Sequence, residues 1–343
     1  MTFMSTTGQA PVPPIPPVPP AGARGPSGPL RMTSGRWIAL AIGVPVALAL
    51  IGWTGFSLVT TVARGSYPFS YPVPVDDGQV AVNTNAGDVT LREAPGTTTA
   101  RLSGIVYYGL IRPGISESTT PTGANIGMSC NGVNTNCGMN ASLDVPPRTA
   151  VTLWSNGGDI AAADFSSGVT LWAGGGNVTA TSLAGDLQLD TGGGDLTGNG
   201  LTGAIQVATE GGNINADNWT GSGTTHIDTG GGDLSASGLT GNVQLATEGG
   251  NVDASGVASG AVNIDSGGGD ITLALTQAPD SLVITAEGGN VTVILPPGDT
   301  TYGLSLPDTQ GGNVSYPSSL VNSKSTHKIS IDSAGGDITI SQG

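Results

Sequence analysis

The sequence is poor in the residue types from which most enzymes build their active sites. Of its 343 residues only 4% are aromatic and 10% are charged, whereas 57 are glycine. No Lys or Arg occurs between Arg148 and Lys324, and the only two histidines are His226 and His327. An enzyme needs carboxylates matched to a base or a cationic group in one cleft, and the sequence offers almost no such pairs. We therefore predict a non-catalytic, all-β repeat protein.

Charge is divided unevenly along the chain. The N-terminal part, 1–64, contains four arginines and no acid, while all 25 carboxylates lie beyond it. The part after residue 64 has six basic residues and therefore a net charge of −19. Such a surface repels phosphate backbones, so we expect no nucleic-acid partner.

The stretch from Trp37 to Ala63 contains no charged residue. It is long enough to cross a hydrocarbon core of about 30 Å as a helix, and we predict a transmembrane helix over 37–63; a cleaved signal peptide is the alternative. Three arginines precede this stretch and Arg64 follows it, which places the N-terminus in the cytoplasm. The sequence thus predicts a single-pass cell-membrane protein with an extracellular C-terminal part.

Proline is concentrated on both sides of the predicted helix. Residues 1–36 include the run PVPPIPPVPP, which favours polyproline II, and we predict a disordered Pro-rich cytoplasmic tail. Residues 64–78 are also rich in proline, and we predict a stiff stalk that lifts the following domain off the membrane.

A Gly-Gly step followed by Asp or Asn recurs at nearly regular intervals along the second half of the chain. We call this Asp or Asn the zero position; it is occupied by Asp159, Asn177, Asp195, Asn213, Asp233, Asn251, Asp270, Asn290, Asn313 and Asp337. Positions −8, −6 and +1 are aliphatic in nearly every copy, and this alternation is typical of strands. One repeat cannot bury its apolar row, but stacked repeats can.

We therefore predict a parallel β-solenoid (β-helix) over 79–343, with one rung for each repeat of 18–20 residues. An insertion at about 92–150 interrupts the array after a degenerate copy at Asp88. No separate cap is visible at either end of the array. We expect the paired glycines to supply backbone angles that other residues avoid, and the zero-position side chains to cap turn amides and stack as ladders.

Acidic residues follow a cycle of two rungs. Rungs with Asp at zero add an Asp at −5, whereas rungs with Asn at zero carry Glu at −3. These oxygens are suitable ligands for calcium, and the candidate calcium residues are Asp190, Asp195, Glu210, Asp228, Asp233 and Glu248. The calcium-binding nonapeptide repeat, however, returns every nine residues, half the spacing found in this chain. The interpretation we favour is structural, with no metal and no other cofactor.

The only two cysteines, Cys130 and Cys137, lie in an Asn/Gly-rich stretch of the insertion. This stretch belongs to the part of the chain predicted to be extracellular, where disulfides persist. We predict a local disulfide between them.

The repeated apolar-x-apolar-x-Thr-x-Gly-Gly-Asp/Asn-apolar unit resembles the bacterial putative-adhesin family of β-strand repeat proteins of unknown function. The Pro-rich tail and single span resemble its actinobacterial, membrane-anchored members. The resemblance implies a solenoid at the cell envelope and carries over no functional residue. We expect a cell-surface structural or interaction protein that binds a wall polymer, a glycan or a protein. The alternative is an envelope-stress sensor or regulatory scaffold that couples the outside domain to a cytoplasmic or membrane partner.

Overall fold

The chain folds into two long β-sheets, seen in a computed structural model that describes residues 65–343 except 86, 122, 129–136 and 307–311. The predicted tail at 1–36 and the predicted transmembrane helix at 37–63 lie outside the described residues and stay predictions. Within the described residues, no helix is both long enough and apolar enough to cross a membrane. The one helical segment among them is the short 3-10 helix η1 (Ser318–Leu320).

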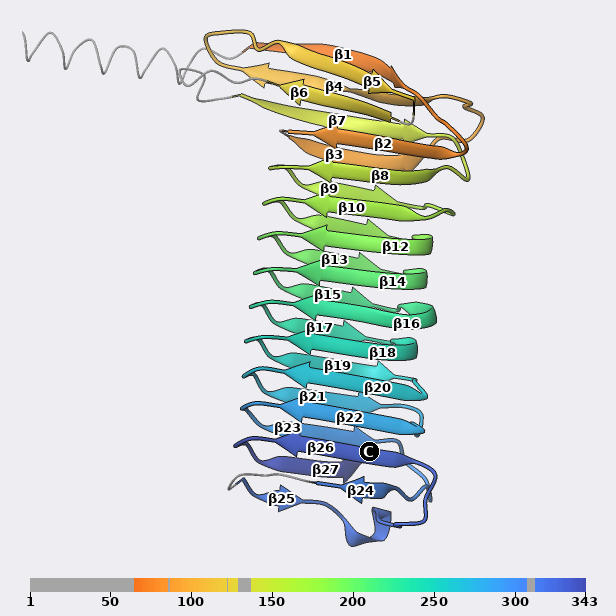
Figure 1. Cartoon of the computed structure of the whole chain (residues 1–343), viewed down its shortest axis with the longest axis vertical. Helices are drawn as coiled ribbons and strands as arrows, with labels where there is room; N and C mark the ends of the chain where they lie inside the picture. The colour runs from red at the N-terminus through yellow and green to blue at the C-terminus, as the bar shows by residue number, and fades with distance from the viewer. Residues whose placement is uncertain (1–64, 86, 122, 129–136, 307–311) are drawn as a thin grey trace, which may run out of the picture. The chain divides into compact units, whose positions relative to one another are not determined.

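The first sheet has 14 strands (Figure 1). In spatial order these are β1 (Gly65–Val73), β4 (Ala100–Tyr108), β7 (Gly138–Val145), β3 (Asp88–Glu93), β9 (Ile160–Ala163), β11 (Val178–Thr181), β13 (Leu196–Asn199), β15 (Ile214–Asp217), β17 (Leu234–Ser237), β19 (Val252–Val257), β21 (Ile271–Leu275), β23 (Val291–Leu295), β27 (Ile338–Gln342) and β25 (Val314–Ser315).

The second sheet has 13 strands. Starting from the same end of the stack, these are β5 (Ile115–Thr120), β6 (Gly123–Met128), β2 (Gln79–Thr84), β8 (Ala150–Ser155), β10 (Val169–Ala173), β12 (Ala184–Thr191), β14 (Thr202–Thr209), β16 (Thr220–Thr229), β18 (Thr240–Thr247), β20 (Ala261–Ser266), β22 (Ser281–Ala286), β26 (Lys328–Ser333) and β24 (Gly303–Ser305).

Each regular repeat gives one strand to each sheet, and equivalent residues of successive repeats pair in parallel. Leu187 pairs with Ile205 in the second sheet, and Leu196 pairs with Ile214 in the first. These aliphatic side chains are buried between the sheets, because alternate residues of each strand face inward. The predicted all-β stack of parallel rungs is therefore confirmed.

The predicted stalk at 64–78 is wrong, because Gly65–Val73 forms the edge strand β1 and pairs antiparallel with β4. Both prolines within this strand, Pro68 and Pro72, lack an N–H group, so an edge strand is where a sheet tolerates them. They also reduce the number of free donors at the edge, which protects it from pairing with another chain.

The predicted insertion supplies strands β4 to β7, of which β4 and β5 run antiparallel to their neighbours. Together with β1 they lie at the first end of the stack (Figure 1). We call residues 65–148 the N-terminal cap. The cap was not visible from the sequence, because its strands carry no repeat motif apart from the degenerate copy at Asp88.

The far end of the stack is closed by a change in chain order. The rung of Asp337 lies between those of Asn290 and Asn313, since β27 pairs with both β23 and β25. The chain thus runs out to the short edge strands β24 and β25 and then returns to insert its last full rung between them and the rung of Asn290. Short edge strands limit further pairing at this end.

The paired glycines are needed for close stacking rather than for unusual backbone angles. Of the second glycines in the steps from Gly158 to Gly336, only Gly289 has a positive φ, of 77°, among the described residues. A Cβ added at Gly194 would lie 2.1 Å from the carbonyl oxygen of Gly176, one rung away, whereas a Cβ at Gly193 would meet nothing within 4 Å. Our expectation about backbone angles is therefore wrong for nearly all of these steps.

The described strand pairing and the buried core both lie within residues 65–343. All the described strands of both sheets lie between Gly65 and Gln342, and the buried apolar cluster runs from Phe69 to Ile340. Among the described residues, every strand of the rungs finds its pairing partners within this range. Residues 65–343 thus contain both sheets and the buried cluster between them.

Candidate functional site

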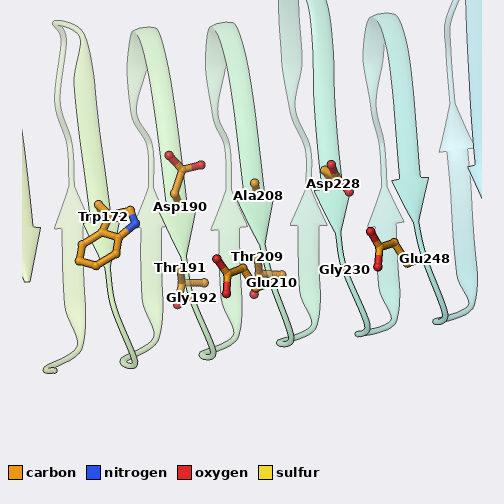
Figure 2. Close-up of a pocket in the computed structure, with 10 residues that line it drawn as sticks. All are labelled: Trp172, Asp190, Thr191, Gly192, Ala208, Thr209, Glu210, Asp228, Gly230 and Glu248. Atoms are coloured by element: carbon orange, nitrogen blue, oxygen red, sulfur yellow. The ribbon is translucent and has the colours of Figure 1, made fainter. Parts of the chain in front are cut away.

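A groove with a volume of about 550 Å³ crosses the outer face of the second sheet. Figure 2 shows Trp172 at one end, followed by Asp190, Glu210, Asp228 and Glu248 on successive rungs. We call these five residues and the space between them the acidic groove. It brings together four of the six candidate calcium residues.

The register of the strands explains why these acids gather in one groove. Asp190 pairs with Ala208, Ala208 with Asp228, and Asp228 with Ala246. Aspartates at −5 therefore stand two rungs apart, with an alanine between them, as the two-rung cycle in the sequence predicts. All of them face outward, because positions −6 and −4 on the same strands are buried.

The glutamates at −3 alternate with glycines, and these glycines cannot be replaced without a clash. A Cβ added at Gly192 would lie 2.4 Å from the carbonyl oxygen of Gly174, and one at Gly230 would lie 2.3 Å from that of Glu210. Side chains at −3 therefore rise only from every second rung. The groove has low points at Gly192 and Gly230, and Glu210 and Glu248 stand beside them (Figure 2).

The carboxylates of the acidic groove have no basic partner in this part of the chain. The sequence has no Lys or Arg between Arg148 and Lys324, and the ion pair of Arg92 with Asp144 and the contact of His327 with Asp280, both found among the described residues, lie elsewhere. Burial raises the pKa of Asp190, and a hydrogen bond of 3.0 Å from Gln188 Nε2 opposes this rise. The groove thus concentrates negative charge that the described residues do not neutralise.

Two tryptophans that the sequence did not single out extend the row of Asp190. Trp154 pairs with Trp172, and Trp172 pairs with Asp190, so all three occupy position −5 on neighbouring strands. Trp154 is 40% exposed. The signal that could have found them is their place in the repeat, because −5 is the position of the groove aspartates and an aromatic side chain there must face outward.

The other two candidate calcium residues, Asp195 and Asp233, lie in a separate row along the corner of the solenoid. There each zero-position side-chain oxygen accepts a hydrogen bond from the backbone N–H at the zero position of the next rung. Ten such bonds, of 2.7–3.1 Å, run from Asp88 to Asn313. The predicted ladder of capped amides is confirmed.

The described part of the chain contains no cluster of three or more His, Cys, Asp or Glu residues that could hold a metal ion. The six candidates divide between the groove and the corner ladder, where the oxygens already accept backbone hydrogen bonds. The expectation that these residues bind no metal stays a prediction.

The remaining polar candidates are not among the residues that line the groove. His226 is exposed and pairs with Gln206 on one side and Gln244 on the other, as expected for a polar residue on the outer face of a strand. Cys137 packs, partly buried, against the core. Cys130 lies outside the described residues, so the Cys130–Cys137 disulfide stays a prediction.

The sequence model of the Toastrack DUF4097 family matches residues 73–341, and the resemblance to the bacterial putative-adhesin family is confirmed. No curated protein matches the chain. Similar solved structures include a putative adhesin from Parabacteroides merdae, at 12% identity and a TM-score of 0.36 over 82% of this chain and 97% of that one. A putative adhesin from Bacteroides fragilis matches at 12% identity and a TM-score of 0.31, over 81% and 97%.

Proposed function

The chain belongs to the Toastrack DUF4097 family, and from its acidic groove we propose that this member is a non-catalytic cell-surface interaction protein. Residues 37–63 would anchor it in the membrane, with the solenoid outside the cell. The groove would bind an extended, positively charged ligand across several rungs. The observation that carries this proposal is the row of four unneutralised carboxylates that ends at Trp172.

The chemistry of the groove favours a cation. Carboxylates at regular intervals attract ammonium or guanidinium groups and orient them as they approach. An indole face also attracts such groups, by about 0.5–2 kcal/mol. Because each kind of acid, Asp at −5 and Glu at −3, recurs every two rungs, at an interval of about 10 Å given the usual strand spacing, the pattern suits a chain that carries repeated positive groups.

The direct test is binding of an oligolysine peptide to the purified domain, residues 65–343, measured by calorimetry at low ionic strength. We expect binding that weakens as salt is added, and no binding of an oligoglutamate of equal length. The variant with Glu210→Gln and Glu248→Gln should lose affinity by about tenfold, or about 1.4 kcal/mol.

A matched control removes the same charge from elsewhere on the domain. Asp253 lies on β19 of the first sheet and Asp299 follows β23, and both are exposed. The variant with Asp253→Asn and Asp299→Asn should bind oligolysine nearly as well as the unmodified domain. Equal losses in the two variants would mean that only the overall net charge attracts the peptide, which would contradict a specific groove.

A further inference from the structure

The N-terminal cap exposes a group of large apolar side chains at one corner. Ile105 and Tyr107 on β4 are 42% and 43% exposed, and Leu110 and Ile111 in the loop after β4 are 40% and 44% exposed. All four lie within seven consecutive residues. An exposed apolar cluster of this kind marks an interaction surface more often than scattered single residues do. We call these four residues the apolar corner.

The apolar corner lies where the chain enters the cap. Gly65, the first described residue, pairs with Tyr108, and Ser66 pairs with Tyr107. The Tyr108 ring lies so close to Gly65 that an added Cβ would be 2.4 Å from it. In the sequence Arg64 comes immediately before, and the uncharged stretch ends at Ala63. At most two residues therefore separate the predicted transmembrane helix from this corner.

The loop that carries Leu110 is fixed to β1 by aromatic and polar contacts. The Tyr67 hydroxyl donates a hydrogen bond of 2.8 Å to the carbonyl oxygen of Pro113. The guanidinium of Arg112 lies 3.8 Å from the centre of the Tyr67 ring, and the Tyr67 and Tyr108 rings are 6.1 Å apart. Tyrosine and arginine are side chains suited to the boundary between lipid and water, since each combines an apolar body with a polar end.

Charge separates the cap from the rest of the domain. Residues 65–148 hold four arginines and six acids, a net charge of −2, whereas residues 149–343 hold two lysines and 19 acids, a net charge of −17. The cap is thus the part that an anionic lipid surface repels least, and the rungs beyond it are strongly repelled.

We propose that the apolar corner docks on the surface of the lipid bilayer from which the chain emerges. The proposal goes beyond ligand binding in the groove and rests on the proposed membrane anchoring. Because the connection is so short, the corner is held at a high effective concentration near the lipid, so a small apolar contact is enough. The domain then sits directly on the membrane, with its cap at the lipid surface.

The test uses the full chain reconstituted in vesicles of phosphatidylcholine and phosphatidylglycerol. Tyr107 is replaced by the photoreactive p-benzoylphenylalanine, which cross-links to neighbouring C–H bonds on irradiation. The matched control carries the same probe in place of Val283, which is 40% exposed but lies on β22. We expect lipid adducts, detected by mass spectrometry, at position 107 and none above background at position 283. Ile105→Asp with Leu110→Asp should abolish the adduct at 107. Val283→Asp with Val321→Asp should not, because these two valines are 40% and 39% exposed but lie outside the cap.

Extraction with alkaline carbonate separates the two proposals. If the chain resists extraction but position 107 gives no lipid adduct, docking is overturned and anchoring stands. If carbonate releases the chain, anchoring fails and docking fails with it. A cross-link from position 107 to a second copy of the chain would also overturn docking, in favour of contact between copies.

Discussion

The N-terminal cap and the regular rungs bury similar aliphatic side chains but hold their strands together in different ways. In the rungs, parallel strands repeat the same contacts, and glycine carbonyls stack directly above one another at the corner. In the cap, β1 and β4 pair antiparallel along their whole length with no repeat motif, and four arginines offset most of the charge of six acids. The rungs depend on a few positions used many times, and the cap depends on individual contacts.

The largest expected effect on stability comes from the stacking of glycines at the corner, and it should distinguish the two glycines of one Gly-Gly step. Gly194→Ala should destabilise the domain by about 3 kcal/mol, the upper range for an overpacked site, because the new methyl would lie 2.1 Å from the Gly176 carbonyl oxygen. Gly193→Ala places the same methyl in open space and should change stability by no more than about 0.5 kcal/mol. Urea unfolding of residues 65–343 measures both, and equal effects would contradict the stacking explanation.

A second prediction concerns the only rung whose +6 position is Trp. Trp219 is fully buried, and its indole Nε1 donates a hydrogen bond of 3.0 Å to the Gly198 carbonyl oxygen. A Cβ at Gly198 would lie 2.4 Å from the indole, so Gly198→Ala should destabilise the domain by about 2 kcal/mol.

A second substitution that makes room for the new methyl group tests this explanation more sharply. On the next rung the small residue is Ala216 and the large one is Leu239, and both are buried. Adding Trp219→Leu to Gly198→Ala copies that arrangement and should recover most of the lost stability. A double variant less stable than Gly198→Ala alone would show that alanine is excluded there for a reason other than the indole.

The corner ladder offers a smaller effect that depends on charge. Asn251 Nδ2 donates a hydrogen bond of 3.1 Å to Asp233 Oδ1, and Asn251 Oδ1 accepts one of 2.9 Å from the Asp270 backbone N–H. Asn251→Asp would remove that donor and place a third carboxylate between two others. We expect a loss of about 1 kcal/mol at pH 7, which acid and added salt should both reduce.

The control for this variant adds the same charge away from the ladder. Asn242 is exposed on β18, outside the row of zero positions, and Asn242→Asp should have a smaller effect on thermal unfolding. An equal loss in both variants would mean that added net charge, not the order of Asp and Asn in the ladder, sets the stability.

Much of the repeat region could be predicted from the sequence because its residues recur in register. The aliphatic residues at −8, −6 and +1 predicted the strands and the core, and the alternation of Asp and Glu predicted each kind of acid on every second rung. The reason for the glycines could not be predicted, since the need for Gly194 comes from a carbonyl on another rung. The tryptophan row was missed because Trp154 and Trp172 occupy −5 in rungs that precede the first groove aspartate, so the pattern of acids does not point to them although their place in the repeat does.

The cap resisted prediction because its pairings join segments that share no pattern. The proline-rich stretch from Gly65 to Val73 has the composition of a spacer, and it becomes a strand only through its partner β4, which follows β2 and β3 along the chain. The return of the chain at Asp337 was hidden as well, since an array read along the sequence places Asn313 before Asp337. Composition describes local preference, whereas edges and ends are set by contacts at long range.

The smallest expected effect concerns pH and compares Asp190 with an ordinary exposed acid of the rungs. Burial raises the pKa of Asp190 in the folded protein above its ordinary value of 3.8. At a pH between the ordinary pKa and the raised pKa, the folded state therefore holds a proton that the unfolded state has lost. Stability contributed by this group therefore falls as pH rises through that window and is regained as the solution is acidified. Asp190→Asn should remove this dependence and slightly stabilise the domain at pH 7, whereas Asp253→Asn should leave it unchanged. Thermal unfolding from pH 3 to pH 8 measures the difference, and parallel curves for Asp190→Asn and the unmodified domain would show that burial in the groove does not disfavour the charged carboxylate.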